Sequence, residues 1–301
     1  MPWPRSAAVI ANALRFPEIS TSRFTFNEML AEVDHARQVV ERTSRRHRPW
    51  AESEGSSLPL GVTWLENERA FNFAVHSEHA ETVTLLLYSS RDLVNPVRSV
   101  PFDFLRNKSG RVWHCRMPIS EIGDACYYAY SVSGHAADAF HCFDPQKVLL
   151  DPYAKCVFFP SGFDREVAAQ PGSNAGRAAL GALSAHRPSF DWSGDCAPRP
   201  ESDAIIYELH VKGYTHNSNS GVDPSRAGTY LGLTEKIPYL KELGVTVVEL
   251  MPVFQRDPLE RDYWGYMPLN FFGPHPCLSA LGTGSPQSGA GSPTRTPKVK
   301  T

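Results

Sequence analysis

The stretch AIIYELHVKGY at residues 204–214 is a largely apolar run, and such a run is typical of a strand buried on both faces of a parallel sheet. LTEKIPYLKELG at residues 233–244 follows, with apolar residues at helical spacing and a glycine placed to end the helix. VTVVELMPV at residues 245–253 is a second apolar run. Strand, helix and strand in this order predict a βαβ unit, with two parallel strands and a right-handed crossover.

Two residues of this unit carry further expectations. Pro238 lacks an amide hydrogen and its ring clashes with the preceding helical turn, so a helix tolerates it only near its start. The helix is therefore expected to begin close to Pro238. His210 lies within the first apolar run, which is expected to be a buried strand, and is interpreted as a hydrogen-bonded core histidine rather than as a metal ligand or a catalytic base.

Upstream, residues 58–134 have the short alternating pattern of antiparallel strands. RAFNFAVHS, ETVTLLLYS, RVWHCRMP and CYYAYSVSG follow one another, separated by turn-prone stretches such as NKSG. Several short strands at this spacing predict an immunoglobulin-like antiparallel β-sandwich of roughly one hundred residues. Its Trp64 and Trp113 are either core residues or platforms on which a sugar ring stacks.

The remaining segments have weaker patterns. Residues 1–57 are interpreted as an extension with one amphipathic helix, which begins at the capping-box sequence TFNE and ends near Ser44. Residues 151–203 are turn-prone and are expected to connect the sandwich, placed at 58–150, with the βαβ unit. Residues 277–301 are rich in Gly, Ser, Pro and Thr and contain no Asp or Glu. This tail is expected to be disordered because it cannot bury enough apolar surface to offset its ordering entropy.

The bulk composition excludes several classes of protein. A formal net charge of -2 gives no electrostatic reason to expect nucleic acid or an acidic membrane surface as partner. Six cysteines without C-x-x-C spacing argue against a zinc ribbon and a disulfide-rich secreted scaffold. The N-terminus lacks the apolar core of a signal peptide, and no run is long enough to span a membrane. A cytoplasmic protein with free thiols is therefore expected.

The common catalytic and nucleotide-binding signatures are missing from the sequence. There is no phosphate-loop motif, no G-x-G-x-x-G after either strand, no G-x-S-x-G and no H-E-x-x-H. The eleven histidines have no metal-ligand spacing. We therefore expect no cofactor and no metal.

Several longer stretches resemble one family. PLGVTWLENERAFNFAVHSEHAETVTLLLY at residues 59–88 resembles the opening of the family-48 carbohydrate-binding module that precedes debranching enzymes, and LLDPYAK at residues 149–155 resembles the junction after it. DAIIYELHVKGYT, GTYLGLTEKIPYLKELGVTVVELMPV and DYWGYMPLNFFGPHP resemble the start of the catalytic barrel in isoamylase-type glycogen debranching enzymes, of glycoside hydrolase family 13. The resemblance covers about residues 58–276. It implies a multidomain β plus α/β protein, in which the sandwich is followed by an incomplete (β/α)8 barrel over residues 204–276.

The same resemblance implies a retaining α-glycosidase that hydrolyses α-1,6 branch linkages of glycogen or a similar α-glucan. Such enzymes need a carboxylate nucleophile and a second carboxyl group as acid and base. In the family these groups come from barrel strands four, five and seven, and this chain is expected to be truncated after strand two. The resemblance therefore implies no catalytic residue in this chain and no activity by itself.

What the resemblance does carry over is the aromatic loop after strand two. The tyrosine of the family's W-G-Y motif stacks on the glucosyl ring beside the scissile bond and corresponds to Tyr266, while Trp264 shapes the same pocket. The alternative is that both side chains only pack the loop. The acidic residues Asp257, Glu260 and Asp262 form either a calcium site, as in some relatives, or a solvated acidic loop.

Three hypotheses remain open from the sequence. The chain is the N-terminal part of a debranching hydrolase, a non-catalytic glucan-binding or regulatory module, or the translated remnant of a disrupted gene. The abrupt change in composition at Cys277 favours the last. An α-glucan is the expected ligand, and the sequence does not identify which protein partners the chain has.

Overall fold

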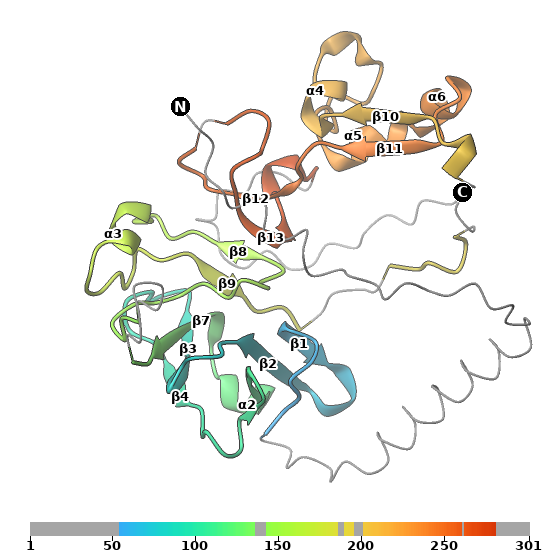
Figure 1. The fold of residues 1–301 in the computed structure, drawn as a ribbon. Helices are drawn as coiled ribbons and strands as arrows, with labels where there is room; N and C mark the ends of the chain where they lie inside the picture. Colours follow the sequence, from blue (N-terminus) through green and yellow to red (C-terminus); the bar gives the residue numbers. More distant parts are fainter. Residues whose placement is uncertain (1–53, 136–142, 186–189, 196–200, 261, 281–301) are drawn as a thin grey trace, which may run out of the picture. The chain divides into compact units, whose positions relative to one another are not determined.

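The computed structural model describes residues 54–135, 143–185, 190–195, 201–260 and 262–280. In these ranges the chain forms two antiparallel sheets, a βαβ unit and a hairpin, which Figure 1 colours from blue to red along the chain. The helix expected to end near Ser44 and the tail from residue 281 lie outside the described residues.

The first sheet has the strand order β1-β2-β6-β5, and each neighbouring pair is antiparallel. Its strands are β1 (Gly61–Leu65), β2 (Ala70–His76), β5 (Lys108–Ser109) and β6 (Val112–Pro118). The 3-10 turn η2 (Glu66–Glu68) joins the first two strands. Backbone from residue 54 onward covers the outer face of β2, because the buried Asn72 amide exchanges hydrogen bonds with the backbone of Ser56.

The second sheet has the order β4-β3-β7-β9-β8. Its strands are β3 (Thr82–Ser89), β4 (Arg98–Pro101), β7 (Ala125–Ser133), β8 (Val157–Phe158) and β9 (Leu180–Ala182), and α2 (Ile119–Ile122) leads from the first sheet into β7. Two of these strands, with α3 (Arg165–Ala169) between them, come from the segment expected only to connect. Strands of two and three residues are too short to show an alternating pattern, so they could not be predicted from the sequence.

The inner faces of the two sheets meet in one apolar core, which confirms the predicted antiparallel sandwich. Trp113 is fully buried there, so it is a core residue and not a sugar platform. Trp64 packs at the edge of the core, with its ring centroid 4.9 Å from that of Phe71. The buried core residues are Phe71, Phe73, Val75, Ala80, Val83, Leu85, Leu87, Phe102, Trp113, Cys115, Met117, Ile122, Tyr128, Tyr130 and Val132.

The outer face of the second sheet is also covered. A second cluster of buried residues joins this face to the chain that follows β7: Tyr88, Ala129, Val148, Ala178 and Leu180. The buried side chain of Asn174 exchanges hydrogen bonds with the backbone of Val148 and fixes this covering segment. Among the described residues, the Tyr88 ring on this face is therefore covered by the following chain.

The βαβ unit forms as predicted, with β10 (Ile206–Leu209) parallel to β11 (Val247–Leu250). The crossover contains α4 (Val211–Thr215), η4 (Ser218–Ser220), α5 (Tyr230–Glu235) and α6 (Ile237–Glu242). Pro238 is the second residue of α6, where its missing amide costs no helical hydrogen bond. The prediction that the helix begins close to this proline is confirmed.

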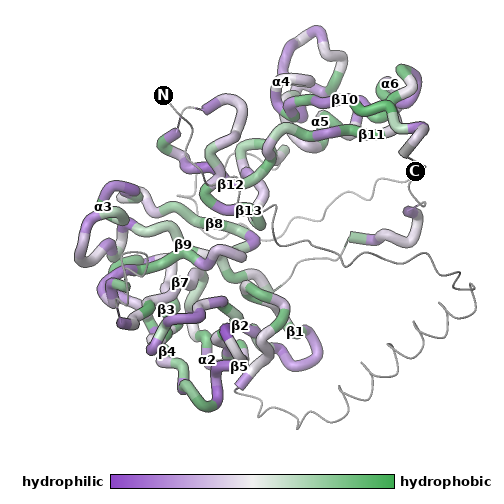
Figure 2. The backbone as a smooth tube through the Cα atoms, viewed as in Figure 1, coloured by the Kyte–Doolittle hydropathy of each residue, from purple (hydrophilic) through white to green (hydrophobic). Residues whose placement is uncertain are grey.

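The expected burial of both strands is wrong. All four residues of β11 are exposed, and in β10 only Leu209 is buried. β10 and β11, whose apolar residues are green in Figure 2, form a two-stranded sheet in the described part of the chain. The physical reason is that a strand is buried on both faces only where layers cover the sheet from both sides.

A hairpin closes the described chain. β12 (Phe254–Arg256) pairs antiparallel with β13 (Pro268–Pro274), and η5 (Pro276–Leu278) follows with a buried Leu278. The boundary expected at residue 277 therefore falls within an ordered turn. Among the described helices none has the length and apolar character needed to cross a bilayer.

Candidate functional site

The loop between β12 and β13 presents large aromatic side chains to solvent. Trp264 is 52% exposed and Tyr266 is 59% exposed, and both predicted site residues lie on this loop. Phe271 and Phe272 on β13 are exposed as well. A group of exposed aromatic residues on one short segment is the kind of surface that marks a binding site.

Gly265 determines how the two predicted residues sit on the loop. Its φ is +87°, a conformation that L side chains rarely adopt, and a Cβ atom there would lie 2.9 Å from the carbonyl oxygen of Pro252. Only glycine fits this close approach without strain. Trp264 packs edge-on against Tyr263, with centroids 5.8 Å apart, whereas Tyr266 remains open to solvent.

His210 holds the loop from the βαβ unit. Its Nδ1 accepts a hydrogen bond from the amide of Gly213 at 3.0 Å and thereby caps α4. That leaves Nε2 to donate to the carbonyl oxygen of Tyr263 at 2.9 Å. The imidazole also stacks on the Tyr263 ring, with centroids 4.4 Å apart. The histidine is hydrogen-bonded, as expected, but the expectation that it lies in the core is wrong, because it is only half-buried and follows β10 as the N-cap of α4. Its role is to anchor the loop.

Arg256 holds the same loop from the hairpin. Its Nη1 donates to the carbonyl oxygen of Asp262, and its Nε donates to Nε2 of His275 at 3.1 Å. Burial, and then the charge of Arg256, lower the pKa of His275 to about 4. His275 is therefore neutral near pH 7 and accepts this hydrogen bond.

The acidic residues Asp257 and Glu260 pair with an arginine that was not predicted from the sequence to belong to the site. Arg165 of α3 forms ion pairs with Glu260 and, at 3.4 Å, with the buried carboxylate of Asp257. Asp262 accepts a hydrogen bond from the amide of Trp264 at 2.9 Å and so belongs to the loop turn. Across the described ranges, no three His, Cys, Asp or Glu side chains come together as metal ligands would.

This arrangement supplies a stacking surface. The face of an aromatic ring suits the C-H patch of a pyranose ring and attracts developing positive charge. Glycoside hydrolysis additionally requires a nucleophilic carboxylate and a carboxylic acid that face the glycosidic bond. Asp257 and Glu260 are instead committed to Arg165. Sequence reasoning identified the exposed loop residues and missed their supports, His210, Arg256 and Arg165.

Comparison with known proteins assigns the sandwich to one family and the region from the βαβ unit to the hairpin to another. Residues 59–154 match the family "Carbohydrate-binding module 48 (Isoamylase N-terminal domain)", and residues 212–270 match "Alpha amylase, catalytic domain". Isoamylase 3, chloroplastic, of Oryza sativa subsp. japonica is 37% identical over 78% of this chain and 32% of its own length. The glycogen operon protein GlgX homolog of Mycobacterium tuberculosis is 36% identical over 73% of this chain and 32% of its own.

Solved structures agree on the fold. The pullulanase from Bacillus acidopullulyticus superimposes with a TM-score of 0.52 and 26% identity, over 77% of this chain and 27% of that chain. The catalytic module of the glycogen-degrading pneumococcal virulence factor SpuA gives a TM-score of 0.53 at 22% identity, over 76% and 34%. The chain spans about a third of the length of the curated relatives it matches. It belongs to the isoamylase-type glycoside hydrolases, with a carbohydrate-binding module 48 followed by a partial alpha-amylase catalytic domain.

Proposed function

We propose that this chain is the N-terminal part of a debranching hydrolase that acts on α-1,6 linkages of glycogen or a similar glucan, and that Tyr266 and Trp264 form one wall of its glucan site. The observation that carries the proposal is the exposure of these two aromatic side chains on a loop that is held from both sides. Relatives named isoamylase and glycogen operon protein support the substrate class. So does a pullulanase of similar fold solved with maltotetraose.

The aromatic loop is pre-organised for binding. Gly265, His210 and Arg256 fix the loop backbone before any ligand arrives, so little ordering entropy is lost on binding. A glucosyl ring that stacks on Tyr266 gains contact area without desolvating a buried polar group.

The 301-residue chain is proposed to bind glucan without hydrolysing it. Its sequence resembles the barrel only through the second strand, and the family's catalytic carboxylates come from later strands. A non-catalytic glucan-binding module remains the second candidate, and the aromatic loop would be its binding surface too. The aromatic residues of the sandwich suit this role less well because most of them are buried.

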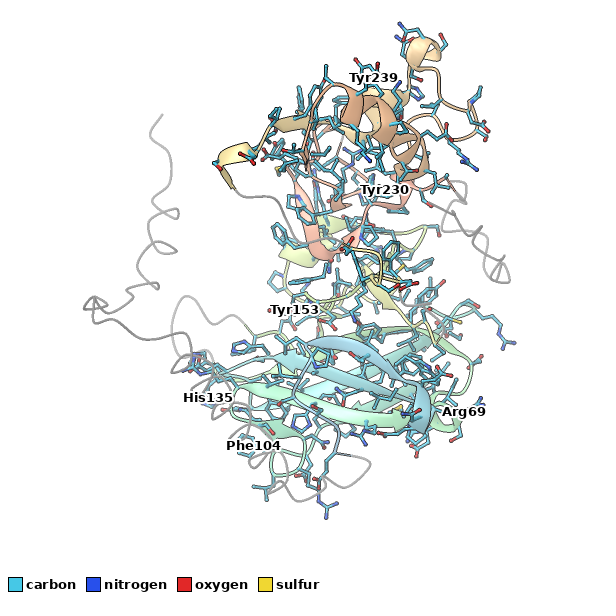
Figure 3. All side chains as sticks on the ribbon, turned by 90° about the vertical axis from the view of Figure 1, so that its right-hand side faces the viewer. Arg69, Phe104, His135, Tyr153, Tyr230 and Tyr239 are labelled. Carbon is cyan, nitrogen blue, oxygen red and sulfur yellow. The ribbon has the colours of Figure 1, made fainter. Side chains whose placement is uncertain are left out.

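Titration with maltoheptaose tests the proposal. Tyr266→Ala and Trp264→Ala are each expected to weaken binding about tenfold, which corresponds to about 1.4 kcal/mol. Phe104→Ala is the matched control, because Phe104, labelled in Figure 3, is an equally exposed aromatic residue that lies outside the loop. Unchanged affinity in the loop variants, or an equal loss in the control, would refute the assignment.

An amylopectin assay tests the second half of the proposal. The 301-residue chain is expected to release no reducing ends. Release that persists in purified protein would show that the chain hydrolyses glucan unaided.

A further inference from the structure

The turn D-P-Y-A at residues 151–154 is where the sandwich contacts the β12–β13 hairpin. The fully buried carboxylate of Asp151 accepts a hydrogen bond from the hydroxyl of Tyr128 at 2.9 Å and another from the amide of Tyr153 at 2.8 Å. Tyr128 belongs to β7 and lies in the sandwich core. The turn is therefore fixed to the core of the sandwich.

Asn270 of β13 contacts this turn with its side-chain amide. Its Nδ2 donates to the carbonyl oxygen of Pro152 at 3.1 Å and lies 3.4 Å from that of Asp151. Its Oδ1 accepts from the amides of Phe272 at 2.8 Å and Gly273 at 2.7 Å. One buried amide thus satisfies backbone groups on both sides of the contact, and an unpaired partner there would cost about 1–3 kcal/mol.

Two further close contacts lie beside the side-chain amide of Asn270. The ring of Tyr153, labelled in Figure 3, stacks on that of Phe272 with centroids 4.4 Å apart. A Cβ atom on Gly273 would lie 3.4 Å from the carbonyl oxygen of Ala154, so the two backbones approach closely. The contact is therefore a fitted surface and not a single hydrogen bond.

The hairpin transmits this contact to the aromatic loop. Asn270 pairs with Gln255 across the two strands, and Arg256 pairs with Pro268. Arg256 in turn donates to the carbonyl oxygen of Asp262, where the aromatic loop begins. A displacement of Asn270 from the turn would therefore move the backbone that carries Trp264 and Tyr266.

We propose that Asn270 is a positioning residue, which fixes the aromatic loop to the 151–154 turn so that the sandwich orients one wall of the glucan site. The identity of the ligand rests on the proposed function, whereas the contact between Asn270 and the turn can be tested without any ligand. The sandwich then contributes to glucan binding through the loop that it holds.

Asn270→Asp separates the two sides of the contact. A carboxylate still accepts from the amides of Phe272 and Gly273, but it has no hydrogen to donate to Pro152. Asn174→Asp is the matched control, because Asn174 is also buried and its amide both donates to and accepts from the backbone of Val148, within the sandwich. Both variants lose a donated hydrogen bond, and only the first touches the hairpin.

The expected result is a split between the two variants. Asn270→Asp should weaken maltoheptaose binding about tenfold and speed amide hydrogen exchange at residues 262–267, while Asn174→Asp, matched in stability loss, should do neither. Equal effects of both variants, or no effect of Asn270→Asp on loop exchange, would overturn the proposal. If the unaltered chain does not bind maltoheptaose, the proposed function fails, and the exchange comparison still decides the positioning role.

Tyr153→Leu keeps the test available if Asn270→Asp does not fold. This variant removes the stack on Phe272 and leaves the hydrogen bonds of the turn in place. Loop exchange should rise in the same direction and by a smaller factor. Loop exchange identical to that of the unaltered chain would count against the proposal.

Discussion

The sandwich and the hairpin loop are both rich in aromatic residues and use them in opposite ways. Trp113, Phe73 and Tyr128 of the sandwich are 0% exposed, whereas Tyr266 and Phe271 of the hairpin are about 60% exposed (59% and 61%). The two sheets of the sandwich cover each other's inner faces, and a two-stranded hairpin has no second sheet to cover it. Aromatic content therefore does not by itself identify a sugar site, because burial decides whether a ring is available to a ligand.

The βαβ unit is similar to the hairpin in this respect, because most of its strand residues are exposed. Its helices form, its strands pair in the predicted direction, and yet the strand side chains remain exposed. Local sequence is sufficient for these elements to form, whereas burial depends on layers that this stretch alone does not provide. Three substitutions test the contrast, beginning with the one expected to have the largest effect.

Trp113→Ala should destabilise the sandwich by about 3–5 kcal/mol, because it leaves a large cavity in a packed core. The indole also donates to the carbonyl oxygen of Ser77 at 3.1 Å, and that hydrogen bond is lost as well. Urea unfolding followed by circular dichroism measures the change. Tyr266→Ala, at an exposed ring, should cost less than about 1 kcal/mol. Similar losses in the two variants would remove the distinction between the two regions.

Asp151→Asn should remove a pH-dependent part of the stability of the folded chain. Burial raises the pKa of Asp151 from 3.8 to about 6, so the folded state binds this proton more tightly than the unfolded state does. The resulting stability is fully present below pH 3.8 and is lost as the pH rises through about 6, by ~3 kcal/mol in total. The amide cannot ionise, and the variant should therefore escape this loss.

The difference between Asp151→Asn and the unaltered chain should grow from about pH 4.5 to about pH 7.5, as measured by urea unfolding across that range. His275 works in the opposite direction, because its lowered pKa adds stability that is lost as the pH falls from 6.5 towards 4. It is common to both proteins and cancels in the difference. A difference that does not vary with pH would contradict the burial of an ionising Asp151.

Gly265→Ala should cost about 1–2 kcal/mol from the left-handed backbone alone, and more from the clash with Pro252. Gly221→Ala is the control, since Gly221 has a φ of +74° and open space around its Cβ position. Near-ultraviolet circular dichroism should change only in the first variant, because its strain falls between Trp264 and Tyr266. Identical spectra and stabilities for both variants would refute the close approach at Gly265.

Much of the fold could be predicted because each main element carries its own local pattern. The alternation along β2, β3, β6 and β7 indicates a sandwich, and the two apolar runs around a helix indicate a βαβ unit. β8 and β9 were missed because they pair through so few residues. The exposure of β10 and β11 was missed because burial is a property of the surrounding layers.

The candidate site likewise contains some residues that could be predicted from the sequence and others that could not. Tyr266 and Trp264 could be identified from a local motif, whereas the residues that hold them come from distant parts of the chain. Asn270 meets Asp151 across a sequence separation of 119 residues, and Arg165 meets Asp257 across 92. No periodicity or spacing encodes such contacts. They follow only from how the sandwich and the hairpin pack.

A hydrogen-exchange footprint of maltoheptaose on the 301-residue chain tests most directly whether the aromatic loop is the glucan site. We predict slower exchange at residues 262–272 and no change in β2, β3, β6 and β7. Slower exchange in those sandwich strands, with residues 262–272 unchanged, would contradict this prediction.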